Sequence, residues 1–136
     1  MSTPATIRLQ QSIDRPPAEV WRALTEPGLL STWWAPGDVK AAVGHRFELD
    51  MGGAFGKQAC VVLAVQERKL FSYSFAPGRL DTTITWTLEP EGAGTRLTLE
   101  HAGFNLETPM GKAAYGGMGA GWPQILATIG PALAGR

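Results

Sequence analysis

The chain has 136 residues, of which 44% are hydrophobic, and its twelve basic residues balance its twelve acidic ones. This length is enough to bury the core of a single domain over residues 1–136, and the lone cysteine, Cys60, favours a reducing compartment because it cannot form an internal disulfide. The basic residues are scattered and form no positively charged patch, which argues against a nucleic-acid binder. The sequence shows neither a signal-peptide pattern nor an apolar run long enough to cross a membrane, so we expect a cytoplasmic protein without membrane insertion.

The first third of the chain predicts one strand followed by two short helices. Apolar and polar residues alternate over 5–13, which predicts a strand with one buried face. Over 17–24 an opening proline precedes one apolar face, which predicts a helix. Thr25 is expected to cap a second helix, which includes Trp33 and Trp34 at helical spacing and is broken by the Ala-Pro-Gly sequence that follows.

The middle of the chain changes to a period of two. Strands are predicted at 45–51, 58–66, 70–76, 82–89 and 95–102. Because the connections between them are short, consecutive strands must be antiparallel neighbours. In the first of these strands, Phe47, Leu49 and Met51 share one face. Glu48 and Asp50 fall on the other face, which we expect to be solvated, so they are poor candidates for an acid and base pair.

The last third returns to helix. One apolar stripe contains Ile125, Leu126, Ile129 and Leu133. Four glycines between 116 and 121 weaken any helix before this stripe, and Pro123 removes a backbone hydrogen bond unless it lies in a first turn. We therefore expect a kink, or two helical pieces, near Trp122.

This order of elements predicts an α+β fold. Its parts are a curved antiparallel six-stranded sheet, a long C-terminal helix around which the sheet wraps, and two short helices between the first and second strands. Such a sheet is dry on one face, and a single helical stripe is too narrow to cover six curved strands completely. A cavity between the sheet and the last helix is the expected result.

Five local motifs in this order carry a family resemblance. They are PAEVWRAL at 17–24, WWAP at 33–36, FELDMGG at 47–53, TRLTLEHAGF at 95–104, and GW at 121–122 followed by IL at 125–126. Together they resemble the SRPBCC or START-like superfamily, whose helix-grip fold is that of the birch-pollen allergen, and within it the branch homologous to the activator of the heat-shock-protein-90 ATPase. The superfamily includes ligand carriers, polyketide cyclases and chaperone activators, so the resemblance implies a fold and a cavity rather than one reaction.

The alternation of residues along the strands and the positions of the tryptophans predict which residues form the cavity wall. They are Trp33, Trp34, Phe47, Leu49, Met51, Tyr73, Phe75, Trp86, Leu99, His101, Phe104, Met118 and Trp122. A mostly apolar wall with a few polar groups is typical of a small-molecule pocket. The alternative is that these side chains simply pack together as the core of the sheet. Cys60 stays unassigned, because almost every residue of the strand at 58–66 is apolar.

His101 is the most suggestive polar residue. It continues the alternation of Leu97 and Leu99, so it is predicted to point inward. There a neutral imidazole can orient a ligand or carry a proton, with Tyr73 as an assistant. The alternative is a buried histidine whose polar atoms are satisfied by a backbone carbonyl.

Other residues with useful chemistry give weaker signals. Two histidines and one cysteine show no metal-ligand spacing, so we expect neither a metal nor a cofactor. His45, at the start of a strand, is expected on the surface. Arg79 follows the Pro-Gly pair of a hairpin and is either an ordinary exposed arginine or a contact for an anionic ligand head at the mouth of the cavity.

Three functions follow from these observations. The first is a non-catalytic protein that holds a small apolar or aromatic molecule in the cavity. The second is an enzyme of the cyclase or dehydratase kind, with His101 as proton carrier and Tyr73 as the orienting residue. The third, implied only by the branch resemblance, is an interaction module with a chaperone as partner. Exposed aromatic residues near Trp33 and Trp34 also leave a homodimer open, because they pack against a second copy as readily as against a ligand.

Overall fold

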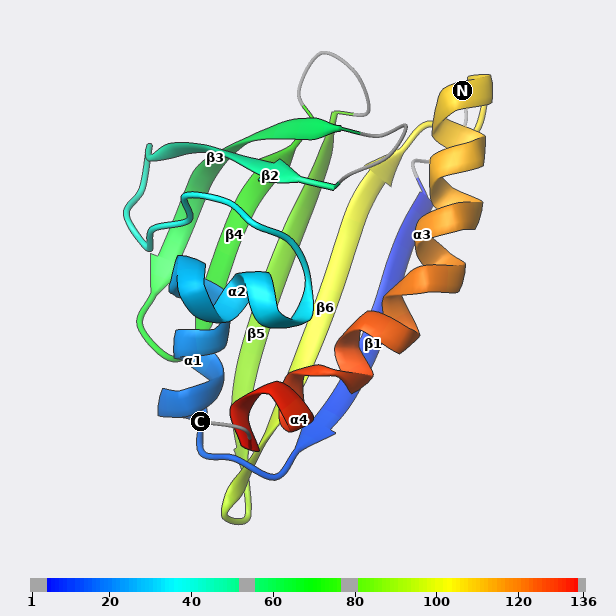
Figure 1. Ribbon diagram of the computed structural model, residues 1–136. Coiled ribbons are helices and arrows are strands. Elements are labelled where there is room, and N and C mark those ends of the chain that lie inside the picture. Colours follow the sequence, from blue (N-terminus) through cyan, green and yellow to red (C-terminus); the bar gives the residue numbers. More distant parts are fainter. Residues whose placement is uncertain (1–4, 52–55, 77–80, 135–136) are drawn as a thin grey trace.

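One antiparallel sheet of six strands organises the fold (Figure 1). The computed structural model describes residues 5–51, 56–76 and 81–134. The strands are β1 (Ala5–Ile13), β2 (Arg46–Asp50), β3 (Lys57–Gln66), β4 (Leu70–Phe75), β5 (Thr82–Glu91) and β6 (Gly94–Phe104), and the helices are α1 (Pro17–Thr25), α2 (Pro27–Trp33), α3 (Pro109–Ala127) and α4 (Ile129–Ala134). The predicted α+β fold is confirmed, with two short helices before β2 and a long C-terminal helix.

The strand order follows from the short connections. Strands β2 to β6 form a meander of neighbours, and β1 pairs with β6, which gives the order β1-β6-β5-β4-β3-β2. Every pairing is antiparallel. The hairpin between β5 and β6 is the tightest, and its turn contains Gly92 with a φ of 59°, a backbone conformation that glycine adopts without steric cost.

One face of the sheet packs against the core, and this is why buried and exposed residues alternate along the strands. In β5, Ile84, Trp86 and Leu88 are buried, and the residues between them are partly exposed. In β6, Leu99 lies opposite Trp86 and His101 lies opposite Ile84. His101 has no exposed surface, so it points inward as its position in the alternation predicts.

Strand β3, whose alternation the sequence leaves open, contains a bulge. Its register against β4 shifts between Val62 and Ala64. Before the shift Cys60 and Val62 are buried, while Leu63 is 50% exposed. An inserted residue lets one strand change which residues face the core, so a continuous apolar run is compatible with a one-sided sheet. Cys60 is thereby assigned to the core face.

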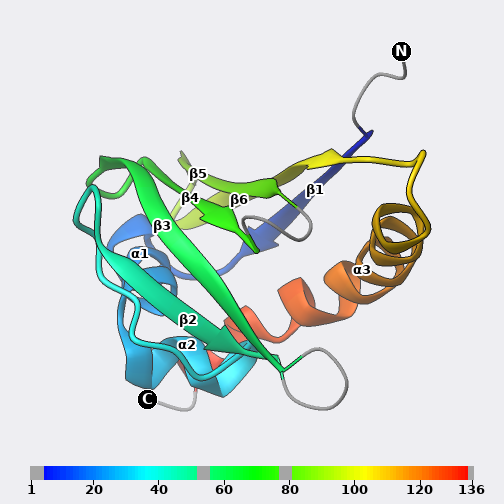
Figure 2. The same cartoon turned by 90° about the horizontal axis from the view of Figure 1, so that it is seen from above.

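The helices cover the core at two places. Helices α1, α2 and α4 pack together at one end of the sheet, and α3 contacts β1 and β6 along the other side (Figures 1 and 2). In the described part of the chain, no helix is both long and apolar enough to cross a membrane.

The C-terminal helical region divides later than the sequence predicts. Helix α3 continues through Pro123, and its ribbon bends along its length, which fits the expected kink (Figures 1 and 2). The alternative of two helical pieces near Trp122 is wrong in position, because the two pieces meet at Thr128. The Thr128 hydroxyl lies 2.7 Å from the carbonyl oxygen of Ile125 and 3.2 Å from that of Trp33. The division therefore occurs where the helix reaches the end of α2, a tertiary contact that local helix propensity does not contain.

Candidate functional site

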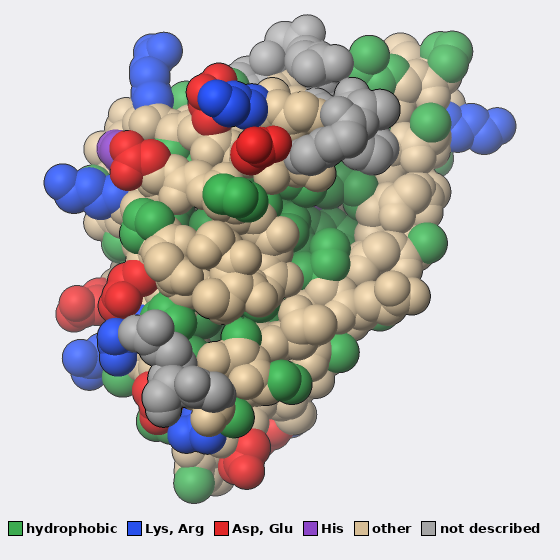
Figure 3. All heavy atoms as spheres, in the orientation of Figure 1, with side chains coloured by type: hydrophobic (Ala, Val, Ile, Leu, Met, Phe, Trp, Pro, Cys, Tyr) green, Lys and Arg blue, Asp and Glu red, His purple; other side chains and the backbone are tan. Residues whose placement is uncertain are grey.

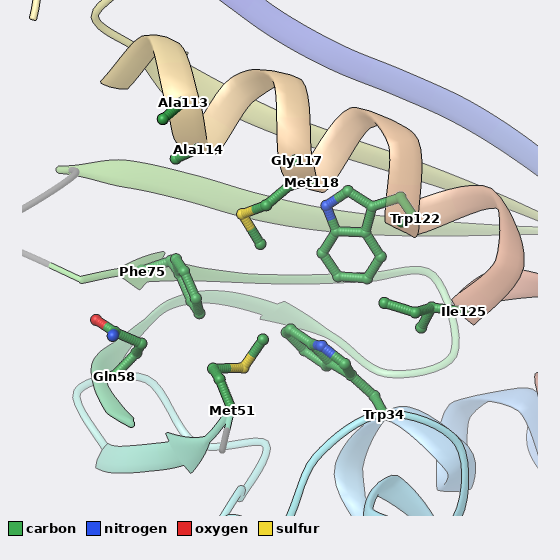
Figure 4. A pocket seen from close by; sticks show the side chains of 11 residues that line it. Trp34, Met51, Gln58, Phe75, Ala113, Ala114, Gly117, Met118, Trp122 and Ile125 are labelled. Carbon is green, nitrogen blue, oxygen red and sulfur yellow. The ribbon is translucent and has the colours of Figure 1, made fainter. Parts of the chain in front are cut away.

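A partly open pocket of about 220 Å³ lies between α3 and one side of the sheet. It is lined by Trp34, Met51, Gln58, Phe75, Ala113, Ala114, Gly117, Met118, Gly121, Trp122 and Ile125. Figure 3 shows hydrophobic side chains at the bottom of this hollow, and Figure 4 shows the lining side chains facing one shared space. None of these lining residues is charged, and Gln58 is the one among them with a polar amide.

Strands β2 to β4 and the end of α2 supply one wall of the pocket. Met51 follows β2, Gln58 lies near the start of β3, and Phe75 ends β4. The second helix was predicted to include Trp34, but it ends at Trp33. Trp34 leaves the helical conformation, with φ −132° and ψ −82°. The two neighbouring indoles stay stacked, with ring centroids 5.9 Å apart. Trp33 is nevertheless buried in the core, while Trp34 lines the pocket.

One face of α3 supplies the opposite wall. Its residues follow helical spacing along that face: Ala114, Gly117, Met118, Gly121, Trp122 and Ile125. A Cβ at Gly117 or Gly121 would meet no atom within 4 Å, so the space of the pocket reaches the helix backbone there. Sequence reasoning missed these glycines because it treated them as helix breakers. The signal was the four-residue spacing between Gly117 and Gly121, which repeats between Met118 and Trp122.

Four indole rings pack against one another beside the pocket: Trp33, Trp34, Trp86 and Trp122. Trp33 donates a hydrogen bond to the carbonyl oxygen of Ala23 (2.9 Å), and Trp86 donates to the hydroxyl of Tyr73 (3.0 Å). Trp122 donates to Nδ1 of His101 (3.2 Å). Trp34 differs from the other three, because its buried Nε1 has no hydrogen-bond partner among the described residues.

His101 links α3 to the sheet through a chain of side-chain hydrogen bonds. An indole N–H can only donate, so Nδ1 of His101 must accept the bond from Trp122. The proton then lies on Nε2, which donates to the Thr82 hydroxyl (2.9 Å), and Thr82 donates to the carbonyl oxygen of Phe75 (3.1 Å). The imidazole is therefore satisfied by side chains and not by the backbone carbonyl considered above. Burial lowers the pKa of His101 to about 3, so the ring is neutral at pH 7.

The remaining titratable candidates are not arranged for chemistry in the pocket. Burial raises the pKa of Tyr73 above its usual range, and burial raises the pKa of the Cys60 thiol to about 12. His45, expected on the surface, is half-buried, and its ring stacks on Phe47. Across the described residues, no group of three or more His, Cys, Asp or Glu side chains is placed to hold a metal ion.

The structure separates the nominated residues into two groups. Five of them line the pocket: Trp34, Met51, Phe75, Met118 and Trp122. The others are buried behind its walls: Trp33, Phe47, Leu49, Tyr73, Trp86, Leu99, His101 and Phe104. Arg79 lies outside the described residues. Contact between any of these residues and a ligand stays a prediction.

The family model of activator of Hsp90 ATPase homolog 1-like proteins matches residues 14–134. The chain belongs to this family. The match covers strands β2 to β6 and all four helices described above, and it confirms the resemblance carried by the sequence motifs. Comparison with the curated proteins gives no match.

Solved structures with this fold come from several organisms. A Mesorhizobium loti protein is 36% identical, with a TM-score of 0.83 over 96% of this chain and 97% of its own. A Bacillus halodurans protein is 23% identical, with a TM-score of 0.80 over 97% of this chain and 99% of its own. The Aha1 dimer from Colwellia psychrerythraea is 19% identical, with a TM-score of 0.80 over 95% and 96%. At such low identity the last two show the fold alone.

Proposed function

We propose that the chain binds a small apolar or aromatic molecule in the pocket between α3 and the sheet. The observation that carries this proposal is a partly open pocket of about 220 Å³ with uncharged, mainly apolar lining residues. An apolar cavity of about 150 Å³ is enough to bind benzene, so this volume suits a molecule of roughly one or two rings. Burial of its apolar surface would supply the main driving force.

The lining side chains suit an aromatic guest. The rings of Trp34 and Trp122 lie 4.9 Å apart between centroids and tilt by 51°, so they form one continuous aromatic surface at the pocket wall. Met51 and Met118 point into the same space (Figure 4). Methionine side chains are flexible and polarizable, so they can adjust around a planar molecule. The pocket therefore combines rigid aromatic surfaces with two adaptable ones.

The geometry favours binding over proton transfer. A general base must come within hydrogen-bond reach of its substrate, and His101 contacts the pocket wall through Trp122 rather than lining the pocket. Both of its ring nitrogens are engaged within the protein. Tyr73 is likewise absent from the lining residues and accepts a hydrogen bond from Trp86. These contacts support a structural role for both residues.

The test is a titration with indane, a two-ring hydrocarbon, followed through the indole resonances of Trp34 and Trp122 in NMR spectra. We expect binding by the unchanged protein and roughly tenfold weaker binding by Gly117→Leu, whose side chain would occupy the space beside the helix backbone. Gly116→Leu is the matched control, because Gly116 is exposed, is not a lining residue and gains the same helix propensity. Absence of binding, or equal weakening by both variants, would contradict the proposal.

Family membership favours a second candidate, an interaction with a chaperone ATPase, because the family is described by homology to an activator of Hsp90. Stimulation of a chaperone ATPase by the isolated chain would support it. A homodimer is part of the same question, since the Colwellia protein with this fold is a dimer. Light scattering gives the mass of the protein in solution and so tests for the homodimer. If Gly117→Leu stimulates the chaperone ATPase as well as the unchanged protein does, the contact with the chaperone lies outside the pocket.

A further inference from the structure

Among the described residues, Trp34 carries a buried polar side-chain atom without a hydrogen-bond partner. The other three indoles of the cluster donate to Ala23, Tyr73 and His101. Trp34 Nε1 is buried and has no hydrogen-bond partner within residues 5–51, 56–76 and 81–134. Buried polar groups are nearly always paired, so an exception at the wall of a pocket needs an explanation.

The side chain of Trp34 is held in place by its ring. Its ring stacks on Trp33 at 5.9 Å and on Phe75 at 6.5 Å between centroids, and it lies 4.9 Å from Trp122. These ring contacts hold the side chain in place without using its N–H. An indole N–H can only donate, so a molecule that pairs with it must present an acceptor.

The rest of the lining limits what that molecule is. None of the described lining residues is charged, so an ionised group buried among them would lose its hydration without compensation from them. Trp34 Nε1 is closed to solvent in this arrangement, so a ligand reaches it only when neighbouring side chains move. Met51 and Met118 line the same pocket (Figure 4), and their rotatable bonds allow such movement. An oxygen acceptor on an uncharged ring system meets these conditions, whereas a carboxylate does not.

We propose that the ligand is an uncharged aromatic molecule of one or two rings that bears a carbonyl or similar oxygen, and that this oxygen accepts a hydrogen bond from Trp34 Nε1. This inference rests on the proposed function of the pocket, and it makes Trp34 the residue that determines specificity. Apolar burial supplies affinity for any ring of suitable size. The Trp34 N–H selects the rings that carry an acceptor.

The experiment compares indane with 1-indanone, two molecules of nearly equal shape that differ by one carbonyl oxygen. Dissociation constants are measured by titration for the unchanged protein and for Trp34→Phe, which keeps an aromatic ring and removes the N–H. We expect the preference for 1-indanone over indane to be roughly tenfold greater in the unchanged protein than in Trp34→Phe. The preference is the ratio of the two dissociation constants, and it is compared between the unchanged protein and Trp34→Phe. The different hydrophobicities of the two probes affect both proteins equally and therefore cancel. Trp21→Phe, a change at a buried indole that does not line the pocket, should leave the preference unaltered.

The outcomes separate this inference from the proposed function. If neither probe binds the unchanged protein, the binding function itself fails. If both bind and Trp34→Phe keeps the full preference, binding stands and the role of Trp34 is overturned. If Trp34→Phe does not fold, a second measurement on the unchanged protein tests the same inference. The Trp34 indole N–H resonance should move downfield with 1-indanone and not with indane, and the same response to both probes would overturn the inference.

Discussion

Lowering the pH from 7 to 5 should destabilise the protein by about 2 kcal/mol through His101. Its pKa is about 3 in the folded protein against 6.5 for an unperturbed histidine, because burial penalises the charged ring. The stabilising contribution is fully present above pH 6.5, where the ring is neutral in both states. Below pH 6.5 the unfolded chain takes up a proton that the folded protein does not, so stability falls by about 1.4 kcal/mol per pH unit until about pH 3.

Burial is the main reason for this loss, and the hydrogen bond between His101 and Trp122 adds a second one. A proton added to Nδ1 would face the indole N–H at an atom separation of 3.2 Å, which places two donors against each other. The bond that joins α3 to β6 would then be lost. The folded protein avoids this state by keeping the ring neutral, and it becomes less stable as the unfolded state gains protons.

The measurement is urea unfolding at pH 7, 6 and 5 for the unchanged protein and for His101→Gln. At pH 7 the variant should be less stable by about 1–3 kcal/mol, because a glutamine amide cannot satisfy Trp122 and Thr82 together as the imidazole does. The difference between the two proteins should then shrink by about 2 kcal/mol at pH 5. His45→Gln, which removes the other histidine, serves as the control and should retain the pH dependence. Parallel pH profiles for the unchanged protein and His101→Gln would refute the reasoning.

Four further outcomes follow from the contacts and the burial. Trp122→Phe should lower the free energy of unfolding by about 1–3 kcal/mol, because Nδ1 of His101 loses its donor, and urea unfolding measures the loss. Gly116→Ala should raise stability by about 0.5–1 kcal/mol, seen as a higher Tm, since the added Cβ meets no neighbour. Gly111→Ala should lower Tm, because its Cβ would clash with backbone. Burial of Cys60 should prevent reaction with a thiol reagent at pH 8 until the protein unfolds.

The strands and their order could be predicted because both depend on short stretches of sequence: the alternation within each strand and the length of each connection. Alternation along β5 and β6 identifies Trp86 and Leu99 as buried, and the short connections force antiparallel neighbours. The division of the C-terminal helix could not be placed in the same way. Glycines and Pro123 weaken the helix near Trp122, yet the division lies at Thr128, whose hydroxyl approaches the end of α2. Contacts between distant segments override propensity there.

The candidate site was predicted less completely than the fold. The alternation of apolar and polar residues shows which side chains face the core, but it does not show which of them line the pocket and which are buried behind its wall. Phe47, Leu49 and Met51 share a face of the second strand region, but the pocket lining includes Met51 and neither of the others. How far helix packing closes over a strand depends on the positions of α1, α2 and α4, which no single strand encodes. The wall formed by α3 was missed for another reason. Gly117 and Gly121 were weighed as costs to the helix, although their absent side chains are what leave the space open.

The two walls of the pocket are stabilised by different means, and this difference bears on how a ligand is accommodated. On the sheet side, Phe75 ends a strand and its carbonyl accepts from Thr82, which in turn accepts from His101. The same chain of bonds reaches across to Trp122, so it fixes one position on α3 relative to the sheet. Earlier along that helix, glycines cost helix stability and leave fewer side chains to pack. If the proposed ligands bind, adjustment to their size is therefore expected on α3 before Trp122, while the Trp122 ring and the backbone of Phe75 stay in place.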